Sequence, residues 1–595
     1  MVTLPVFVEG NTANKCYWQA QPLSAEVPRV ILQSGTAGTS IIYTNSTSAK
    51  ASIATVSGAP SKAFIAYKSN TGTNLLNSPK GRLWNGTGWA SAETEIGNGG
   101  SEIQWIRTAT CPISSRNHER IVISLSNDDY LDVYVWNGSS WKFTDNIGRV
   151  NTVASTYESF DLVYETSSGR AILAYAVLSS DATRDLAYRI WNGTAWSNEA
   201  YIDDSGHASN ANYRWVEMDP NPAATSNGIA MIAMDQTNAH CNGWIWNGIT
   251  WGNFQELENN LATVRDRRLV AVTHEQTSHQ AMFVWGYSNF LKSREFNGTA
   301  WKSELPALNI AATANVGWIS LKPDPVSNKL MVMTIDGGSN LNTVLWNGTT
   351  WASPVAHDAA ISHTLYRCAD FDWEPSGSKG LLVWSTAQNY VSYRTFTAPS
   401  TWSPTITASN PVMHPWIQLR RNSRNVNGDT KILGATLNGN LDIFGFKWNG
   451  TILTFENTAF TTDTNRMVYE CFDIAFLYSN VPLNYDHVLR VTNTGTNTWQ
   501  TRLREYSDSN VGRLLNLTIY LHNSTAGNSR QIYIQSGSYV NQTGPWYNLG
   551  SLQTIYIAMT VQAQSAGASY VYAYLETRNP STTVYDKSVV AFEIT

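Results

Sequence analysis

The stretch Trp84-Asn85-Gly86-Thr87-Gly88-Trp89 decides the fold of this chain, because copies of it recur along most of the sequence. Asn-Gly is the dipeptide that most readily adopts the positive φ angles of a tight hairpin turn. The aromatic residues on either side suit the two strands that such a turn connects. Close copies begin at Trp136, Trp191, Trp246, Phe296 and Trp346, and less regular copies begin at Phe396 and Trp448. The pattern therefore predicts a family of similar β-hairpins.

The spacing of these copies predicts a β-propeller. From Trp84 to Trp448 the mean period is about 52 residues, which fits one four-stranded blade per repeat. Eight copies predict eight blades, with seven as the alternative if the first or last copy lies outside the ring. Near-continuous apolar runs such as residues 171–176 precede the hairpins and are typical of strands buried on both faces. We assign residues 30–476 to the propeller.

The ends of the repeat array indicate how the ring closes. Residues 470–476 resemble the first strand of a blade at residues 158–164, yet no second strand follows them. We therefore expect this orphan strand to share a blade with the start of the array, beside the strand-like residues 30–32 and 41–43. The two tryptophans of each hairpin are expected to face the same side and to pack on the next blade, which gives them a structural role.

The propeller pattern ends near residue 477, and residues 477–595 alternate apolar and polar positions with a period of two. Six or seven such strands between turn-rich segments predict an immunoglobulin-like or jelly-roll β-sandwich. No segment has the pattern of an amphipathic helix, so the whole chain is predicted to be all-β. A tyrosine-rich outer face of the sandwich is a candidate interface, either with another subunit or with the chain's own propeller; it is formed by Tyr520, Tyr533, Tyr556, Tyr570, Tyr572 and Tyr574.

Residues 1–29 are predicted to form an extended segment ahead of the propeller. Residues 2–8 are strand-like, with Val6 and Val8 as candidate contact residues, and Pro5 favours the edge of a sheet. An unpaired sandwich edge can accept a strand from another chain. We therefore expect residues 2–8 either to pair with the sandwich of a neighbouring subunit, giving a head-to-tail polymer, or to pack against their own domain.

Composition limits the partners of the protein. The chain has 595 residues, a net charge of −5 and 14% charged residues, so nothing favours nucleic acid or an anionic membrane. No run of about 18 apolar residues could span a bilayer. The first nine residues lack the basic and apolar regions of a signal peptide, which fits either an intracellular protein or the mature part of a processed one. Five well-separated cysteines predict buried thiols rather than disulfides or zinc ligands.

Signatures of catalysis and metal binding are absent from the sequence. The histidines of His274-Glu275-Gln276-Thr277-Ser278-His279 are five residues apart, whereas a helical zinc-protease motif needs four. The Asp-box spacing of sialidases is missing, and acidic pairs such as Asp203-Asp204 lack the alternate spacing of a calcium loop. We therefore predict no catalytic residue, no metal and no cofactor. Paired carboxylates contributed by different blades, as in a glycoside hydrolase, stay open as an alternative.

Asparagine sequons favour a location outside the cell. Six of the ten coincide with the repeat turn, where turn chemistry alone can generate Asn-Gly-Thr. The other four have no such explanation, and all ten are candidate glycosylation sites. They lie at Asn45, Asn85, Asn137, Asn192, Asn297, Asn347, Asn449, Asn516, Asn523 and Asn541.

With these hairpins and strands laid out, the chain resembles the Trp-Asn-Gly repeat propellers of uncharacterised secreted and cell-surface proteins of archaea and bacteria. The resemblance covers about residues 52–476 and rests on the Trp-Asn-Gly-Thr-x-Trp hairpins and on strands of the Phe160-Asp161-Leu162-Val163-Tyr164 type. The C-terminal module looks like those appended to archaeal surface proteins. The resemblance implies a location outside the cell and a structural or adhesive role, and it carries no functional residues.

The expected function is that of a non-enzymatic extracellular structural protein that assembles with copies of itself into a surface layer, sheath or filament. The weakly charged composition, the sequons on both domains and the tyrosine-rich face support it. The first alternative is a carbohydrate-binding adhesin whose blades present sites for surface glycans. A glycan-acting hydrolase is the second and weaker alternative.

Overall fold

The computed structural model divides the chain into two compact units. The first holds Ser61–Ser423 and Asp429–Ser479, and the second holds Met1–Pro60, Arg424–Gly428 and Asn480–Thr595. In the first unit the structure describes residues 62–70, 75–113, 116–150, 157–177, 184–203, 211–261, 267–310, 312–408, 412–422, 430–464 and 467–477. In the second it describes residues 16–20, 30–34, 40–41, 50–53, 483–493, 499–505, 514–523, 526–535, 538–541, 543–549, 554–563, 569–578 and 584–594.

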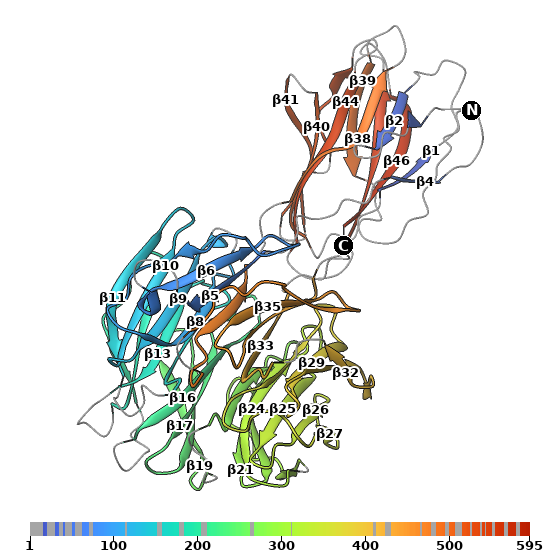
Figure 1. Ribbon diagram of the computed structural model, residues 1–595. Helices are drawn as coiled ribbons and strands as arrows, with labels where there is room; N and C mark the ends of the chain where they lie inside the picture. Colours follow the sequence, from blue (N-terminus) through green and yellow to red (C-terminus); the bar gives the residue numbers. More distant parts are fainter. Residues whose placement is uncertain are drawn as a thin grey trace. The chain divides into compact units, whose positions relative to one another are not determined.

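The first unit is an eight-bladed β-propeller, as the eight hairpin copies predict (Figure 1). Each blade is an antiparallel sheet whose strands follow one another from the inside of the ring to the outside. No α-helix occurs among the described residues, and the helical turn η1 (Leu75–Asn77) is of the 3-10 type.

The strand bounds, from the inner strand outwards, are as follows. Blade 1 has β37 (Phe472–Phe476), β5 (Ala63–Lys68), β6 (Pro79–Trp84) and β7 (Thr94–Glu95). Blade 2 has β8 (Ile103–Thr110), β9 (Arg120–Ser126), β10 (Tyr130–Trp136) and β11 (Trp141–Arg149). Blade 3 has β12 (Phe160–Tyr164), β13 (Ala171–Ala176), β14 (Leu186–Trp191) and β15 (Ala200–Ile202). Blade 4 has β16 (Tyr213–Pro220), β17 (Ile229–Asp235), β18 (His240–Trp246) and β19 (Trp251–Glu258).

The second half of the ring continues in the same way. Blade 5 has β20 (Val270–His274), β21 (Ala281–Tyr287), β22 (Phe290–Phe296) and β23 (Leu308–Asn309). Blade 6 has β24 (Val316–Pro323), β25 (Leu330–Asp336), β26 (Leu341–Trp346) and β27 (Val355–Asp358). Blade 7 has β28 (Ala369–Trp373), β29 (Lys379–Ser385), β30 (Val391–Thr397) and β31 (Thr401–Trp402), with β32 (Ile406–Ala408) also paired to β30. Blade 8 has β33 (Trp416–Arg421), β34 (Ile432–Leu437), β35 (Ile443–Trp448) and β36 (Leu453–Phe455).

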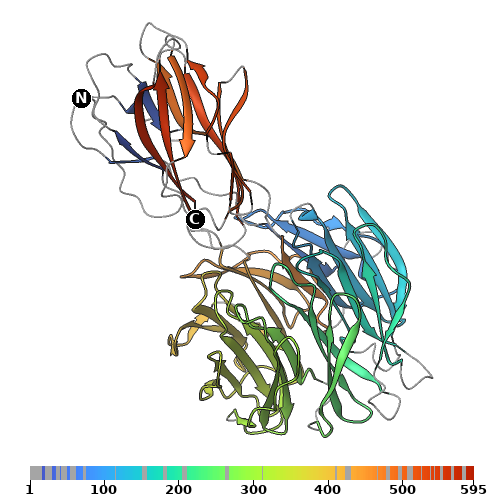
Figure 2. The same ribbon diagram turned by 180° about the vertical axis from the view of Figure 1, so that it is seen from behind.

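Strand β37 closes the ring. It pairs antiparallel with β5, so that Phe472 lies opposite Tyr67 and Phe476 opposite Ala63. Blade 1 therefore combines one strand from the end of the array with three from its start, and its Trp84 is buried with Leu433 of blade 8. In both views the orange strands of blade 8 lie beside the blue strands of blade 1 (Figures 1 and 2). The expected role of residues 470–476 is confirmed.

The expected placement of residues 30–32 and of Ile41 beside the closing strand of the propeller is wrong, and residues 42–43 lie outside the described residues. Strand β2 (Val30–Ser34) pairs with β38 (Leu483–Asn493) of the second unit, and β3 (Ser40–Ile41) pairs with β2. The boundary predicted at residue 30 therefore moves to about residue 61. The reason is that short apolar strands carry no signal of which sheet they join.

The aromatic hairpin residues face the same side of each blade, as expected, but they pack on the preceding blade rather than the next one. The two rings of a hairpin lie 5.6 Å apart at Trp246 and Trp251 and 5.0 Å apart at Phe396 and Trp402. Trp246 of blade 4 contacts Tyr188 of blade 3, with ring centroids 5.6 Å apart. These hairpin residues therefore contact the blade that precedes their own in the sequence.

In every blade except blade 7 the repeat turn is held by its own asparagine. In the first copy the Asn85 side-chain oxygen accepts hydrogen bonds from the backbone N–H groups of Thr87 and Gly88 and from the Thr87 hydroxyl. Gly86 has a φ of 106°, in the region that favours glycine. The same three acceptor contacts recur at Asn449, so the same local hydrogen bonds stabilise the turns of the first and the last hairpin of the ring.

The second unit contains two antiparallel sheets built from both ends of the chain. The six-stranded sheet has the order β4-β1-β46-β45-β39-β43, and the seven-stranded sheet has the order β3-β2-β38-β44-β40-β41-β42. The strands not yet bounded are β1 (Cys16–Ala20), β4 (Lys50–Ile53), β39 (Trp499–Glu505), β40 (Leu514–Asn523), β41 (Ala526–Gln535), β42 (Ser538–Asn541), β43 (Tyr547–Leu549), β44 (Thr554–Ala563), β45 (Ser569–Arg578) and β46 (Val584–Ile594). Strand β1 shows that the N-terminal segment, expected to be an extended arm, supplies a strand between β4 and β46.

The turn geometry predicts the effect of a branched residue. Replacing Gly348 by Val should lower the free energy of unfolding by about 1 kcal/mol or more, because its φ of 99° disfavours a β-branched side chain. An added Cβ would also lie 3.2 Å from the Cβ of Asn328. Urea unfolding measures the change. Gly88→Val is the matched control, since Gly88 lies outside the positive-φ region and has no heavy atom within 4 Å of an added Cβ. Equal losses in the two variants would contradict the turn assignment.

Candidate functional site at the propeller axis

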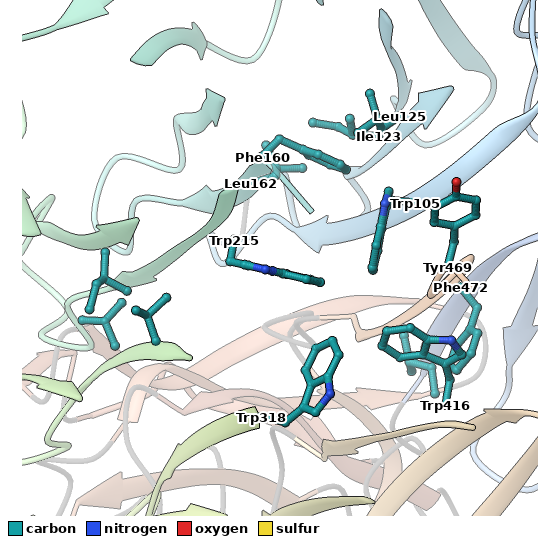
Figure 3. Close-up of a cluster of buried hydrophobic side chains, with 14 of the residues drawn as sticks. Trp105, Ile123, Leu125, Phe160, Leu162, Trp215, Trp318, Trp416, Tyr469 and Phe472 are labelled. Carbon is teal, nitrogen blue, oxygen red and sulfur yellow. The ribbon is translucent and has the colours of Figure 1, made fainter. Parts of the chain in front are cut away.

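Four tryptophans meet at the centre of the ring. Trp105, Trp215, Trp318 and Trp416 come from β8, β16, β24 and β33, the inner strands of blades 2, 4, 6 and 8. Their ring centroids lie 5.2–5.7 Å apart around a closed cycle, and every contact is edge-to-face. Figure 3 shows the four indoles converging on one point. Residues from alternate blades can meet in this way only at the axis, so the tryptophans fill the centre of the propeller.

A tyrosine layer surrounds part of this tetrad. Tyr157 contacts Trp215, Tyr366 contacts Trp416 and Tyr469 contacts Trp105, with ring centroids 5.6–5.8 Å apart. Each tyrosine precedes the inner strand of an odd-numbered blade. All four tryptophans are at least 98% buried, so no continuous channel passes through them.

The axial contacts repeat every two blades rather than every blade. The amides of Val216, Ile319 and Ile417, each following an axial tryptophan, donate to backbone oxygens at the start of the preceding odd blade. The outer hairpins show the same alternation: blades 1, 3, 5 and 7 carry an arginine that donates to a backbone oxygen just beyond the second aromatic residue. These arginines are Arg82, Arg189, Arg294 and Arg394. The structural repeat is therefore a pair of blades of about 100 residues.

A network of ion pairs joins six blades at the axis. Arg107 of blade 2 contacts Glu158 of blade 3 and lies 3.6 Å from Glu470, next to blade 1. Arg367, next to blade 7, donates to Glu470 at 2.5 Å. Arg268, before blade 5, lies 3.8 Å from Glu158. Arg268 also lies 3.9 Å from Glu217 of blade 4, and Arg367 lies 3.6 Å from Asp370, so each arginine of the network lies near a carboxylate, which suits a buried site where an unpaired charge is costly.

Two aspartates at equivalent positions have pKa values that are shifted in opposite directions from the usual value of the side chain. The Asp161 carboxylate accepts the Met218 amide at 2.7 Å, and the Asp370 carboxylate accepts the Leu419 amide at 2.9 Å. Burial, followed by the charge of Glu158, raises the pKa of Asp161 to about 8. Burial acts on Asp370 too, but Lys322 and Arg367 outweigh it and lower the pKa of that carboxyl.

Two polar side chains on the inner strands are partly exposed. Burial raises the pKa of Glu217 and lowers the pKa of Lys322, so protein encloses both groups. The Glu217 side chain nevertheless keeps 19% of its surface exposed, and Lys322 is half-buried. Glu217 and Lys322 are therefore partly enclosed side chains on the inner strands β16 and β24.

The buried hairpin tryptophans hold adjacent blades together. The indole N–H of Trp246 donates to Glu165 at 2.6 Å, and that of Trp346 donates to Glu275 at 2.6 Å. Each acceptor belongs to the preceding blade. Glu275 and His274 of the His-Glu-x-x-x-His stretch are thus used structurally, since His274 Nδ1 lies 2.9 Å from Asp219. Among the described residues no group of three acidic, histidine or cysteine side chains is placed to hold a metal ion.

The structure distributes the sequence-predicted residues over both units. Six sequon asparagines lie exposed at the repeat turns: Asn85, Asn137, Asn192, Asn297, Asn347 and Asn449. Asn516 and Asn523 lie on β40 and Asn541 on β42, whereas Asn45, Val6 and Val8 lie outside the described residues. Cys111, Cys241, Cys368 and Cys471 are buried and unpaired, as predicted.

The six candidate interface tyrosines do not share one sheet. Tyr570, Tyr572 and Tyr574 alternate along β45 in the six-stranded sheet. Tyr520, Tyr533 and Tyr556 lie on β40, β41 and β44 in the seven-stranded sheet, where the register puts Tyr520 opposite Ala558. Tyrosines that alternate in the same way along their strands share a face only if those strands belong to one sheet. These strands belong to two sheets, so the expected single face is replaced by two groups of three tyrosines.

The axial site itself was missed by the sequence reasoning, although a signal for it exists. Trp105-Ile106, Trp215-Val216, Trp318-Ile319 and Trp416-Ile417 recur at about twice the hairpin period. A search at one blade per repeat does not find a feature that occupies every second blade.

No family model and no curated protein matches this chain. Among solved structures, a lectin from Burkholderia pseudomallei is similar with a TM-score of 0.43 and 10% identity, covering 60% of this chain and 99% of that one. A lectin from Aleuria aurantia, solved with α-methyl-L-fucoside, has a TM-score of 0.32 and 11% identity over 53% of this chain and 98% of that one. A protein from Arthrobotrys oligospora, AofleA, has a TM-score of 0.31 and 12% identity over 52% and 87%. No functional residue is carried over from them.

The two aspartates predict opposite pH dependences. A raised folded-state pKa means that the Asp161 carboxyl contributes stability at acidic pH that is lost as the pH rises through about 8. Asp161→Asn should therefore unfold with a flatter pH dependence and gain stability relative to the native chain at pH 9. Asp370 contributes stability above its unfolded pKa, so Asp370→Asn should lose stability at neutral pH. Urea unfolding at pH 5, 7 and 9 measures both, and parallel curves for the two variants would contradict the assignment.

Proposed function

We propose that this protein is a non-catalytic structural protein that acts outside the cell as a self-assembling subunit of a surface layer, sheath or filament. The observation that carries the proposal is the construction of the propeller as a closed, filled ring. Strand β37 locks its ends, and the tryptophan tetrad occupies its axis. Such a ring presents fixed surfaces to neighbouring copies, as a repeating assembly requires.

The outer surface supports this proposal. Six exposed turns of one construction repeat around the ring, each with an Asn-x-Ser/Thr sequon that could carry a glycan. In blade 4 the corresponding position is Ile249, which is 77% exposed and breaks the sequon. A ring coated with sugar except at particular blades would leave protein surface for subunit contacts at those blades.

The titratable groups also support a non-catalytic role. The axial arginines and glutamates pair with one another, and Glu165 and Glu275 bind tryptophan N–H groups. Groups used in this way are held in one protonation state and one geometry. A catalytic acid or base instead needs a reacting proton within hydrogen-bond reach.

Carbohydrate binding is the alternative that a specific observation favours. The second hairpin tryptophans, among them Trp89, Trp196 and Trp251, are only half-buried and lie at the outer part of each blade junction. The indole N–H groups of these three residues are buried and have no hydrogen-bond partner. The exposed part of a half-buried indole can stack on the apolar face of a sugar ring.

Electron microscopy of the purified full-length chain tests the proposal. The protein should form regular filaments or sheets as its concentration rises, because each subunit carries a complete set of contact surfaces. Removal of residues 1–10 distinguishes the strand-exchange contact from the tyrosine-rich surfaces as the polymer contact. A particle of 65.9 kDa that stays monomeric at every concentration would refute the assembly proposal. Monomers that also bind a glycan array would favour the adhesin instead.

A further inference from the structure

The junction between blades 1 and 2 differs from the other three junctions between an odd blade and the even blade that follows it. In those three, the first hairpin tryptophan of the even blade donates its indole N–H to a glutamate of the odd blade. The pairs are Trp246 with Glu165, Trp346 with Glu275, and Trp448 with Glu374, at distances of 2.6–2.9 Å. Each of these glutamates directly follows the inner strand of its blade.

Leu477 occupies the position of the glutamate in blade 1. It directly follows the inner strand β37, and its backbone N–H donates to the Lys62 carbonyl at 2.9 Å. Glu165, Glu275 and Glu374 make the same backbone hydrogen bond to the residue at the start of the second strand of their own blades, at 2.8–2.9 Å. The positions are therefore equivalent, and the carboxylate of the other three junctions is replaced here by an apolar side chain.

Arg120 introduces a positive charge at the same junction. It lies opposite Trp136 in the sheet of blade 2, at a position that is apolar in the other even blades. The equivalent residues are Ile229, Leu330 and Ile432. The junction of blades 1 and 2 thus has a cation where the others have an aliphatic side chain, and it lacks their anion.

No carboxylate balances Arg120. Its guanidinium carbon lies 4.6–5.1 Å from three aromatic ring centroids, those of Phe64, Trp136 and Trp141. The side chain makes no hydrogen bond or ion pair with any residue that the structure describes. Burial alone lowers the pKa of Arg120 to about 10, so the group is still cationic at neutral pH.

Solvent reaches the donors of this junction. Trp136 is half-buried, whereas the tryptophans of the other three junctions are at least 98% buried. Neither Trp136 nor Arg120 has a hydrogen-bond partner for its side chain among the described residues, and only the Nε atom of Arg120 is fully enclosed. The Nη1 and Nη2 atoms of Arg120 and the indole N–H of Trp136 therefore keep accessible surface and can donate to a ligand.

We propose that the junction of blades 1 and 2 binds a carboxylate ligand, whose carboxylate takes the place of the glutamate at the other three junctions. One oxygen accepts from the Trp136 indole N–H and the other from a terminal nitrogen of Arg120. The ligand supplies the negative charge that an enclosed guanidinium needs. An acidic sugar and the acidic side chain of a peptide are the two sources of such a group. The inference goes beyond the proposed assembly and does not rest on it, because the site is complete within one chain.

Calorimetric titration of the full-length chain with glucuronate and with N-acetylglutamate tests the site and distinguishes the two sources. At least one of them should bind saturably, and their neutral counterparts, glucose and N-acetylglutamine, should not. Arg120→Ile introduces the residue that blades 4 and 8 have at this position, and it should weaken binding about tenfold or more through loss of a charge-assisted hydrogen bond. Arg149→Gln is the matched control, because it removes a cation of the same blade whose side chain is 55% exposed.

Leu477→Glu tests the equivalence of the four junctions. The new glutamate places a carboxylate of the chain itself beside Trp136 and Arg120. It should therefore abolish binding of the free carboxylate and raise the midpoint of urea unfolding above that of the native chain.

Loss of binding in Arg120→Ile and Leu477→Glu but not in Arg149→Gln supports the site. Absence of saturable binding of both carboxylates to the native chain overturns it, as does unchanged binding in either Arg120→Ile or Leu477→Glu. If circular dichroism shows that one of these two variants is unfolded, the other decides. If both are unfolded, the native chain decides, and equal affinity for a carboxylate and its neutral counterpart overturns the proposal.

Discussion

The edge-to-face contact of four indoles at the axis is the interaction on which the propeller depends. It joins blades 2, 4, 6 and 8, which are not adjacent in the ring, whereas every other aromatic contact described at the hairpins joins a blade to itself or to its neighbour. Edge-to-face pairs contribute roughly 0.5–1.5 kcal/mol each beyond the burial of their surface. Contacts between distant parts of the chain require the whole ring to be in place, so the tetrad links the stability of each blade to that of all the others.

The polar layer beside the tetrad follows from the same geometry. Eight inner strands converge on one axis, and only four tryptophans fit between them at one level. At the next level the converging side chains are arginines and glutamates, which are tolerated there because they neutralise one another. Asp161 and Asp370 then differ in pKa although they hold equivalent positions, because Glu158 lies near the first and Lys322 near the second. Location on the axis, rather than residue type, sets the charge state.

The sequence predicts the blades well because their signals are local. Asn85 and Gly86 specify a turn through contacts within four residues, and the repetition of that turn reports the architecture. The closing strand at residues 470–476 is also recognisable, because it resembles an inner strand that lacks its partner. Long-range pairing leaves no such trace. Residues 30–34 are strand-like, but nothing in them distinguishes a propeller blade from the sheet of β38.

The axial site was hidden for a related reason. Its members stand about 100 residues apart on alternate blades, and they become one site only when the ring closes. Trp105 and Trp416 illustrate this, since their rings lie 5.7 Å apart although most of the propeller separates them in sequence. A two-blade period is visible in the sequence once it is sought, and the arginines of the odd blades repeat it on the outside of the ring.

Native-state hydrogen exchange tests most directly whether the axial tetrad makes the propeller a single cooperative unit. The amides of Val216, Ile319 and Ile417 donate to the preceding blade beside three of the four axial tryptophans. They should exchange with one common free energy, equal to that of global unfolding, and Trp318→Ala should lower all three together. Exchange of the Ile319 amide alone at a faster rate in Trp318→Ala, with Val216 and Ile417 unchanged, would contradict the account.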